Sequence, residues 1–172
     1  TIVGVVFGGA SSEHNVSIKS ANTVLHAFQS GKNSTKFKVV PIYIDLAGRW
    51  WPKDIAHQAL KKGKSLNQTE LPLAGSSKGF NGLPQGCNEI QVWYPVLHGP
   101  NGEDGTIQGL FKLLGKPFVG SGVLASAMGL DKIAMKMTFT AAGLPQVPYC
   151  SANASELFEE SSRDQLITKL DH

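Results

Sequence analysis

Residues 92–106 read VWYPVLHGPNGEDGT, and this stretch predicts the end of a buried strand and the start of a helix. The first six residues are apolar and aromatic, which is typical of a strand inside a sheet. The next nine residues contain one histidine, two acids and three glycines. Glycine lets the backbone turn sharply and approach a small ligand closely. A helix beginning at Gly105–Thr106 would aim free backbone N–H groups at the same place, which suits an anion.

A second turn of the same character follows the apolar stretch Val3–Phe7. It reads GGASSEH over residues 8–14, and apolar residues at helical spacing resume at Val16. Two polar, glycine-bearing turns in one small domain indicate a binding site shared between them. In α/β folds, ligands bind at the carboxyl ends of the strands, which is where both turns lie.

Strand and helix patterns alternate along the chain, which predicts an α/β fold with a parallel sheet and helices on both faces. We expect strands over residues 2–7, 37–44, 89–97 and 116–120, and a hairpin that turns at 45–48 and returns at 49–51. We expect helices over residues 16–28, 55–62, 106–114, 122–128, 131–143 and 154–170. Surface loops are expected over the remainder of the middle region, including Gly75–Gly79.

Two residues mark the ends of expected helices. Gly115 stands where a left-handed residue closes a helix, and Asp131 stands where an acidic side chain caps the start of one. Lys132 then lies one residue inside a helix N-terminus, where the helix dipole disfavours a cation. This position points to a phosphate partner, although a solvated lysine fits the local sequence equally well.

Composition narrows the class of protein. The 172 residues suffice for one domain and the start of a second, and the lysines behind the net charge of +3 are scattered, which argues against nucleic-acid binding. No apolar run approaches the roughly 20 residues that a membrane helix needs, and the apolar N-terminus lacks the basic segment of a signal peptide. Cys87 and Cys150 are too few for a disulfide framework or a zinc site. We therefore expect reduced thiols in a cytoplasmic protein.

Glu13 and His98 are the residues in the two turns that best suit ligand binding. Glu13 is placed to hold a cation such as a substrate ammonium, although a carboxylate at a helix start is also favoured by the helix dipole alone. His98 is placed to orient a carboxylate or relay a proton, and a purely structural role fits it as well.

Two other kinds of site fit the turns poorly. The glycines at residues 8 and 9 have neither the spacing of a dinucleotide-binding turn nor the lysine of a phosphate-binding loop, which disfavours an ordinary dinucleotide-binding domain. Four side chains form only a diffuse set of metal ligands, namely His14, His98, Glu103 and Asp104. We therefore predict no metal site among them.

Four blocks of this sequence together resemble the D-alanine–D-alanine ligases of bacterial cell-wall synthesis. In chain order they are GGASSEHNVS at 8–17, LHG with GEDGTIQG at 97–109, PFVGSGV at 117–123, and SAM with DK at 126–132. The hairpin at Trp50–Trp51 and the long middle insertion resemble the longer ligase subfamily, which also holds the D-alanine–D-lactate enzymes of vancomycin resistance. The resemblance implies a Rossmann-like, substrate-side domain over residues 1–129 and the beginning of an ATP-grasp domain over 130–172.

The resemblance also implies a reaction. ATP phosphorylates the carboxylate of a first D-alanine, and the amine of a second D-alanine attacks the acyl phosphate. Glu13 would hold the ammonium of the first D-alanine, and Ser17 would support it. His98 and Gly99 would lie beside its carboxylate, where negative charge must be stabilised.

Further roles follow from the same resemblance. Glu103 and the helix that starts at Thr106 would shape the same wall of the site, and Lys132 would reach the nucleotide phosphates. The family takes most of its ATP ligands and its Mg²⁺ ligands from segments after Tyr149, so we expect these outside this chain and expect residues 1–172 alone to be inactive. The family usually has an acid where this chain has Asn15.

Several alternatives stay open at this point. The family suggests a homodimer formed through the N-terminal domain, which nothing in the sequence establishes. D-lactate or D-serine could replace D-alanine as the acceptor, because the loop that usually decides this choice lies outside the chain. A non-catalytic α/β module that grips an amino acid at Glu13 and His98 would share the same two turns.

Overall fold

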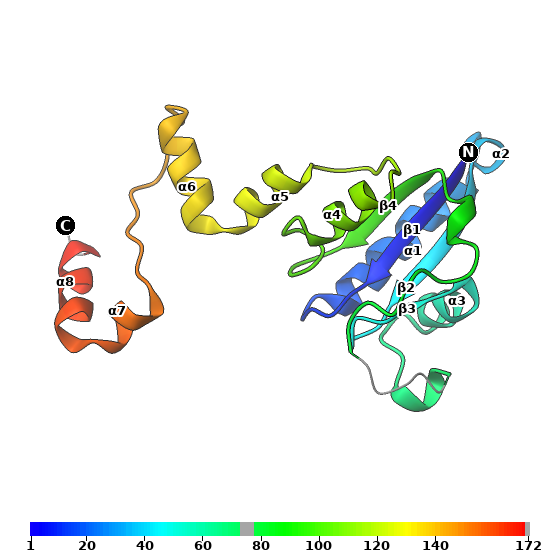
Figure 1. Cartoon of the computed structure of the whole chain (residues 1–172), viewed down its shortest axis with the longest axis horizontal. Helices are drawn as coiled ribbons and strands as arrows, with labels where there is room; N and C mark the ends of the chain where they lie inside the picture. Colours follow the sequence, from blue (N-terminus) through cyan, green and yellow to red (C-terminus); the bar gives the residue numbers. More distant parts are fainter. Residues whose placement is uncertain (73–77, 171–172) are drawn as a thin grey trace. The chain divides into compact units, whose positions relative to one another are not determined.

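The computed structural model describes residues 1–72 and 78–170, which form two compact units. The first unit is Thr1–Leu130 and the second is Asp131–His172. This division lies one residue away from the boundary expected from the sequence. Figure 1 shows the order of the elements along the chain.

The first unit is built on a four-stranded sheet with the order β3-β2-β1-β4. β1 (Ile2–Gly8) runs parallel to β2 (Lys38–Ile44) on one side and to β4 (Val92–Leu97) on the other. The short β3 (Trp50–Trp51) pairs antiparallel with β2 through the predicted hairpin. The predicted α/β fold is confirmed, and its sheet is parallel except for this edge strand.

The register of the sheet brings the two glycine turns to the same edge. Gly8 of β1 pairs with Ile44 of β2 and with Leu97 of β4. These are the last residues of their strands, so the turns that follow Gly8 and Leu97 begin side by side. The prediction that both turns lie at the carboxyl edge is confirmed.

Helices cover both faces of the sheet, as predicted (Figure 1). α1 (His14–Gln29) and α3 (Lys53–Lys62) pack on one face, and α4 (Thr106–Leu113) packs on the other. Side chains alternate along β1, so Val5 and Phe7 enter the first core and Val6 enters the second. Because both faces are covered, β1 is almost entirely apolar.

The strand expected over residues 116–120 is reduced to a single parallel bridge between Trp93 and Phe118. The backbone N–H of Trp93 donates to the Pro117 carbonyl, and the N–H of Val119 donates to the Trp93 carbonyl, both at 2.9 Å. Pro117 has no N–H to extend the ladder, and Gly120 has a φ of +127°, which no extended strand adopts. The prediction of a strand was therefore too long.

The expected helix ends are confirmed at two places. Gly115 follows α4 with a φ of +64°, in the left-handed region. Asp131 caps α6 (Lys132–Ala141), because its Oδ1 accepts hydrogen bonds from the N–H groups of Ile133 and Ala134 at 3.0 and 2.9 Å.

The single helix expected over residues 154–170 is wrong in one respect, because two helices occupy this range. They are α7 (Ala154–Phe158) and α8 (Glu160–Leu170). Glu159 separates them with an extended backbone at ψ 119°. The first of the two starts from a capping box in which Asn153 and Glu156 satisfy each other's backbone N–H groups.

The other elements are short. They are α2 (Asn33–Lys36), the 3₁₀ turns at Gln68–Glu70 and Cys87–Glu89, and α5 (Val123–Leu130). Of the surface loop expected over residues 75–79, residues 75–77 lie outside the described part of the chain. Within residues 1–72 and 78–170, every helix is too short or too polar to span a bilayer.

The core beneath α4 offers a test of the fold. Phe111 is fully buried and stacks on Trp93, with ring centroids 5.0 Å apart. We expect Phe111→Ala to lower the free energy of unfolding by about 3–5 kcal/mol, through lost burial and a cavity. Urea denaturation followed by tryptophan fluorescence would measure the loss.

Leu113 on the same helix is the matched control, because its side chain is 88% exposed. Leu113→Ala should change the free energy of unfolding by no more than about 0.5 kcal/mol. Equal effects of the two substitutions would contradict the packing of α4 on the sheet.

Candidate functional site

The two glycine turns are joined directly at the carboxyl edge of the sheet. The hydroxyl of Ser11 donates to the His98 carbonyl at 2.9 Å, and the backbone N–H of Glu13 donates to the same hydroxyl at 3.2 Å. Glu13 Oε2 lies so close to Gly99 that a Cβ added there would stand 2.9 Å from it. Gly99 also has a φ of +75°, so glycine is required at this contact. The structure thus brings together Glu13, His98 and Gly99.

Glu103 closes the second turn around Gly99. The backbone N–H of Gly99 donates to Glu103 Oε2 at 2.8 Å, while the Gly99 carbonyl accepts from the N–H groups of Gly102 and Glu103. Two carboxylates, from Glu13 and Glu103, therefore lie next to the same glycine. Both side chains belong to exposed residues, and two neighbouring negative charges attract a cation.

The ring of His98 is contacted by α1. Ser20 Oγ lies 3.3 Å from His98 Nε2. Together with the bond from Ser11 to the His98 carbonyl, this contact holds both the backbone and the ring of His98. The sequence did not single out Ser11 or Ser20, because their partner His98 lies in a distant part of the chain.

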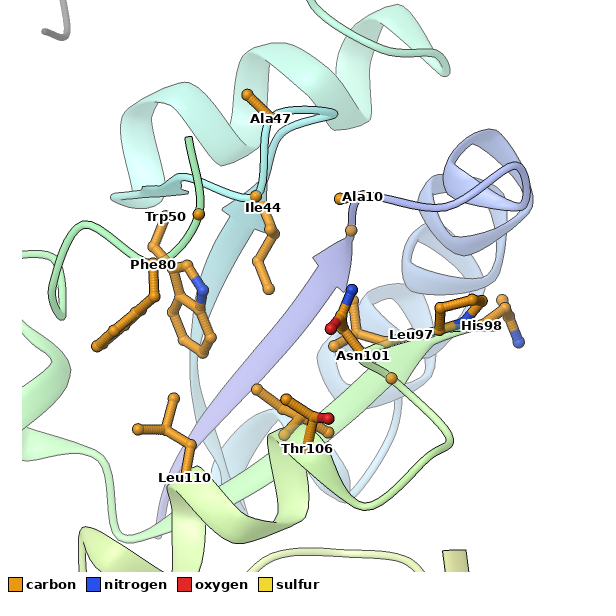
Figure 2. Close-up of a pocket in the computed structure, with 16 residues that line it drawn as sticks. Ala10, Ile44, Ala47, Trp50, Phe80, Leu97, His98, Asn101, Thr106 and Leu110 are labelled. Carbon is orange, nitrogen blue, oxygen red and sulfur yellow. The ribbon is translucent and has the colours of Figure 1, made fainter. Parts of the chain in front are cut away.

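A cavity of about 310 Å³ opens beside His98. Figure 2 shows Trp50 and Phe80 on one side of it, and His98 and Asn101 on the other. Much of the remaining lining is apolar, from Ala10, Ile44, Leu97, Ile107 and Leu110. The space beside His98 therefore suits a small apolar group such as a methyl group.

The expectation of free N–H groups at the start of α4 is wrong for the first of them. Asp104 accepts hydrogen bonds from the backbone N–H groups of Thr106 and Asn101 at 3.0 and 2.8 Å. Although burial alone would raise the pKa of Asp104, these bonds outweigh it and lower the pKa. The helix start is thus occupied by a carboxylate of the chain itself, which disfavours a second anion.

Ser17 lies beneath the turns and has no exposed surface. Its Oγ accepts the N–H of Gly8 at 2.8 Å and donates to the carbonyl of Val96. The hydroxyl therefore joins the ends of β1 and β4, and a role in supporting Glu13 stays a prediction. Asn15, which replaces the usual acid, accepts the N–H of Ser65 at 2.9 Å.

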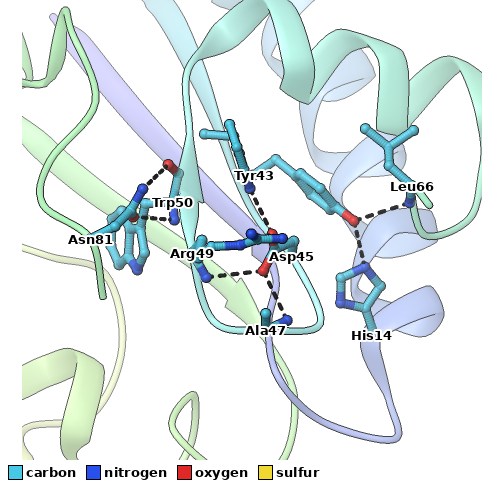
Figure 3. Close-up of polar contacts among 9 residues, drawn as sticks. His14, Tyr43, Asp45, Ala47, Arg49, Trp50, Leu66 and Asn81 are labelled. Carbon is cyan, nitrogen blue, oxygen red and sulfur yellow. Dashed lines mark hydrogen bonds and ion pairs between the residues drawn. The ribbon is translucent and has the colours of Figure 1, made fainter. Parts of the chain in front are cut away.

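His14 is the residue that the sequence analysis missed, since it appeared there only among diffuse metal ligands. It is 2% exposed, and its Nδ1 lies 2.6 Å from the Gly9 carbonyl oxygen. Its Nε2 lies 2.9 Å from the Tyr43 hydroxyl (Figure 3). Burial lowers the pKa of His14, although the bond to Gly9 and the charge of Asp45 act in the opposite direction. Burial also raises the pKa of Tyr43 to about 12.

Asp45 holds the hairpin turn that borders the cavity. Its carboxylate accepts from the N–H groups of Ala47 and Arg49, from Arg49 Nε and from Trp51 Nε1, at 2.8 to 3.0 Å (Figure 3). Both members of the ion pair with Arg49 are largely buried. The sequence identified Asp45 only as a turn residue.

The remaining candidates belong to other segments of the chain. Lys132 belongs to the second unit, where it is the first residue of α6, and its contact with nucleotide phosphates stays a prediction. Among the residues that the structure describes, no group of three or more His, Cys, Asp and Glu side chains could hold a metal ion. Cys87 is a buried free thiol and Cys150 an exposed one.

The chain is an α/β domain with a candidate small-ligand site at the carboxyl edge of its sheet. Residues 2–121 match the family model described as "D-ala D-ala ligase N-terminus". The chain belongs to this family, as its resemblance predicted.

Known relatives agree with this assignment. The chain is 56% identical over 171 residues to the D-alanine--D-alanine ligase of Prochlorococcus marinus (strain MIT 9313), and 54% identical over 169 residues to that of Synechococcus sp. (strain CC9311). These matches cover 99% and 98% of this chain but 48% of each relative. The chain therefore spans about half the length of these curated relatives.

Solved structures show the same fold. The D-alanyl-alanine synthetase A of Vibrio cholerae is 25% identical with a TM-score of 0.71, over 100% of this chain and 45% of that one. The VanG D-Ala:D-Ser ligase of Enterococcus faecalis is 28% identical with a TM-score of 0.64, over 99% and 48%.

The buried His14 predicts how stability depends on pH. Because its pKa in the folded chain is lower than the ordinary 6.5, the unfolded chain binds a proton at higher pH than the folded chain does. The free energy of unfolding should therefore fall as the pH drops below 6.5, until the pKa of the folded state is reached.

Urea denaturation at a series of pH values would measure this slope. His14→Asn removes the titrating ring, so its slope just below pH 6.5 should be shallower than that of the unchanged chain. Equal slopes in the two proteins would contradict a lowered pKa for His14.

Proposed function

We propose that this chain is the substrate-side part of an ATP-dependent ligase that joins two D-alanines for peptidoglycan synthesis. The family assignment supports a ligase, and the relatives named above are D-alanine--D-alanine ligases. In this proposal, residues 1–130 bind the first D-alanine and residues 131–172 begin an ATP-grasp domain. We also propose a cytoplasmic location and a homodimer formed through the first unit, following the family.

One observation supports this function most directly, which is the contact between Glu13 and the turn that carries His98. Glu13 Oε2 lies against Gly99, and the carboxylate accepts no hydrogen bond within the described residues. It is therefore available for a ligand ammonium. His98 precedes Gly99 in the same turn, at a place where its ring can face the carboxylate of the same amino acid.

The chain's own residues then have distinct roles. Glu13 holds the ammonium of the first D-alanine by a charge-assisted hydrogen bond, and Glu103 adds negative charge beside it. His98 donates a hydrogen bond to the substrate carboxylate, which stabilises the charge that develops as the acyl phosphate forms. The apolar cavity beside His98 accommodates the methyl group.

ATP, when bound with Mg²⁺, supplies the phosphoryl group that activates the carboxylate. The described residues contain no cluster of acids that fits a metal ion. We propose that its ligands and most ATP ligands belong to the half of the relatives' length that this chain does not span. Lys132 would contact the nucleotide phosphates from the start of α6.

Glu13→Gln tests the binding of the ammonium. Loss of a charge-assisted bond worth about 1.5–3 kcal/mol should raise the KM for the first D-alanine by at least tenfold. Steady-state kinetics of phosphate release in the full-length protein would measure it. The control is Glu89→Gln, since Glu89 is exposed and pairs loosely with Lys38 at 3.9 Å. A KM equal to that of the control would refute the role of Glu13.

Lys132→Ala tests the nucleotide contact. Removing a cation that pairs with phosphates should raise the KM for ATP more than the KM for D-alanine. The same kinetic assay, with each substrate varied in turn, would measure both constants. Lys112→Ala removes an exposed lysine from α4 and should change neither. A larger rise in the KM for D-alanine than in the KM for ATP would contradict a contact between Lys132 and the nucleotide.

A D-serine acceptor is the second candidate function, because the VanG structure that this chain matches is a D-Ala:D-Ser ligase. Mass spectrometry of products formed from mixed D-alanine, D-serine and D-lactate would identify the acceptor. A non-catalytic module would instead bind D-alanine and form no product with ATP.

A further inference from the structure

The turn at Gly8–Gly9 is held by hydrogen bonds on every side. The N–H of Gly9 donates to the Ile44 carbonyl at 2.9 Å, and the carbonyl of Gly9 faces His14 Nδ1 at 2.6 Å. Gly8 has a φ of +94°, and a Cβ on it would come within 2.1 Å of the Ile44 carbonyl oxygen. The turn therefore has no room for a side chain at Gly8.

The hydrogen bonds at His14 have a definite direction. A carbonyl oxygen can only accept, so His14 Nδ1 must donate its proton to Gly9. In the neutral ring Nε2 is then an acceptor, which takes the hydroxyl proton of Tyr43. The hydroxyl oxygen of Tyr43 accepts in turn from the N–H of Leu66 at 3.3 Å (Figure 3). The relay thus runs from Leu66 through Tyr43 and His14 to Gly9.

Leu66 belongs to the loop that follows α3, and this loop also contacts α1 directly. Asn15, the residue after His14, accepts the N–H of Ser65. Asn15 therefore binds the loop that follows α3 directly, while His14 reaches Leu66 of that loop through the Tyr43 hydroxyl. Glu13 immediately precedes them, and its carbonyl accepts the N–H of Ser17 as that helical turn closes.

We propose that His14 is a positioning residue, which holds the Gly8–Gly9 turn and the neighbouring Glu13 in place for the ammonium of the first D-alanine. This inference rests on the proposed function. His14 is buried, so it acts through the Gly9 carbonyl and the helix start rather than by touching the substrate. Tyr43 fixes the tautomer that makes the bond to Gly9 possible.

Nuclear magnetic resonance tests the relay without any substrate. Long-range ¹H–¹⁵N spectra of this chain should show His14 neutral and protonated at Nδ1. Tyr43→Phe removes the hydroxyl and should shift the Nε2 resonance, while Tyr94→Phe should not. Tyr94 is the matched control because its ring packs against the same core and its hydroxyl lies outside the relay. Protonation at Nε2 in the unchanged chain would overturn the inference.

Two substitutions of His14 test its effect on the substrate. The amide nitrogen of asparagine can take the place of Nδ1, so His14→Asn keeps a donor for the Gly9 carbonyl. Glutamine reaches the place of Nε2, so His14→Gln loses that donor. In the full-length protein, His14→Gln should raise the KM for the first D-alanine about three- to tenfold above that of His14→Asn, with the KM for ATP equal in both.

The outcomes separate this inference from the proposed function. If the unchanged protein binds D-alanine and depends on Glu13, but the two His14 variants have equal KM values, the positioning role is overturned alone. If the unchanged protein binds no D-alanine, the proposed function fails first. Should a His14 variant not fold, Tyr43→Phe against Tyr94→Phe carries the same kinetic comparison, and equal KM values for D-alanine there would overturn the inference.

Discussion

The pairing of β1 with a parallel strand on each side determines where the turns of the site begin. Because Gly8 pairs with the last residues of β2 and β4, three strands end at one edge. The buried hydroxyl of Ser17 then joins β1 to β4 beneath that edge, by accepting from Gly8 and donating to Val96. Two turns that are almost ninety residues apart in the chain therefore start from one rigid base, since Ser11 and His98 are 87 residues apart.

Many side chains around the site bind backbone groups of the turns at this edge of the sheet. Ser11, His14, Asp45 and Glu103 each satisfy a carbonyl or an N–H of a turn. Backbone groups of a turn that no strand or helix pairs need other partners, and these side chains supply them. A ligand site made of turns gains precision in this way, because the turns themselves need not move to meet a ligand.

The sequence predicted the parts of the fold that have a strong local pattern. The continuous apolar run of β1, the hairpin at Trp50 and the Asp131 cap are of this kind, because each depends on neighbouring residues. The relay from His14 to Tyr43 could not be predicted, because its partners are 29 residues apart and meet only through the register of β1 and β2. The expectation of a free N–H group at Thr106 was wrong for another reason. Asp104 is a local acid that competes with any ligand for this N–H group.

Four acidic residues of the first unit differ in how many hydrogen bonds their carboxylates already accept from the chain. Asp45 accepts four hydrogen bonds and pairs with Arg49, and Asp104 accepts from two backbone groups. Glu103 accepts one, from Gly99. Glu13 reaches the same glycine and accepts none among the described residues, so its charge is the least compensated of the four. A ligand cation therefore gains most at Glu13, because there it replaces water rather than a partner that the fold supplies.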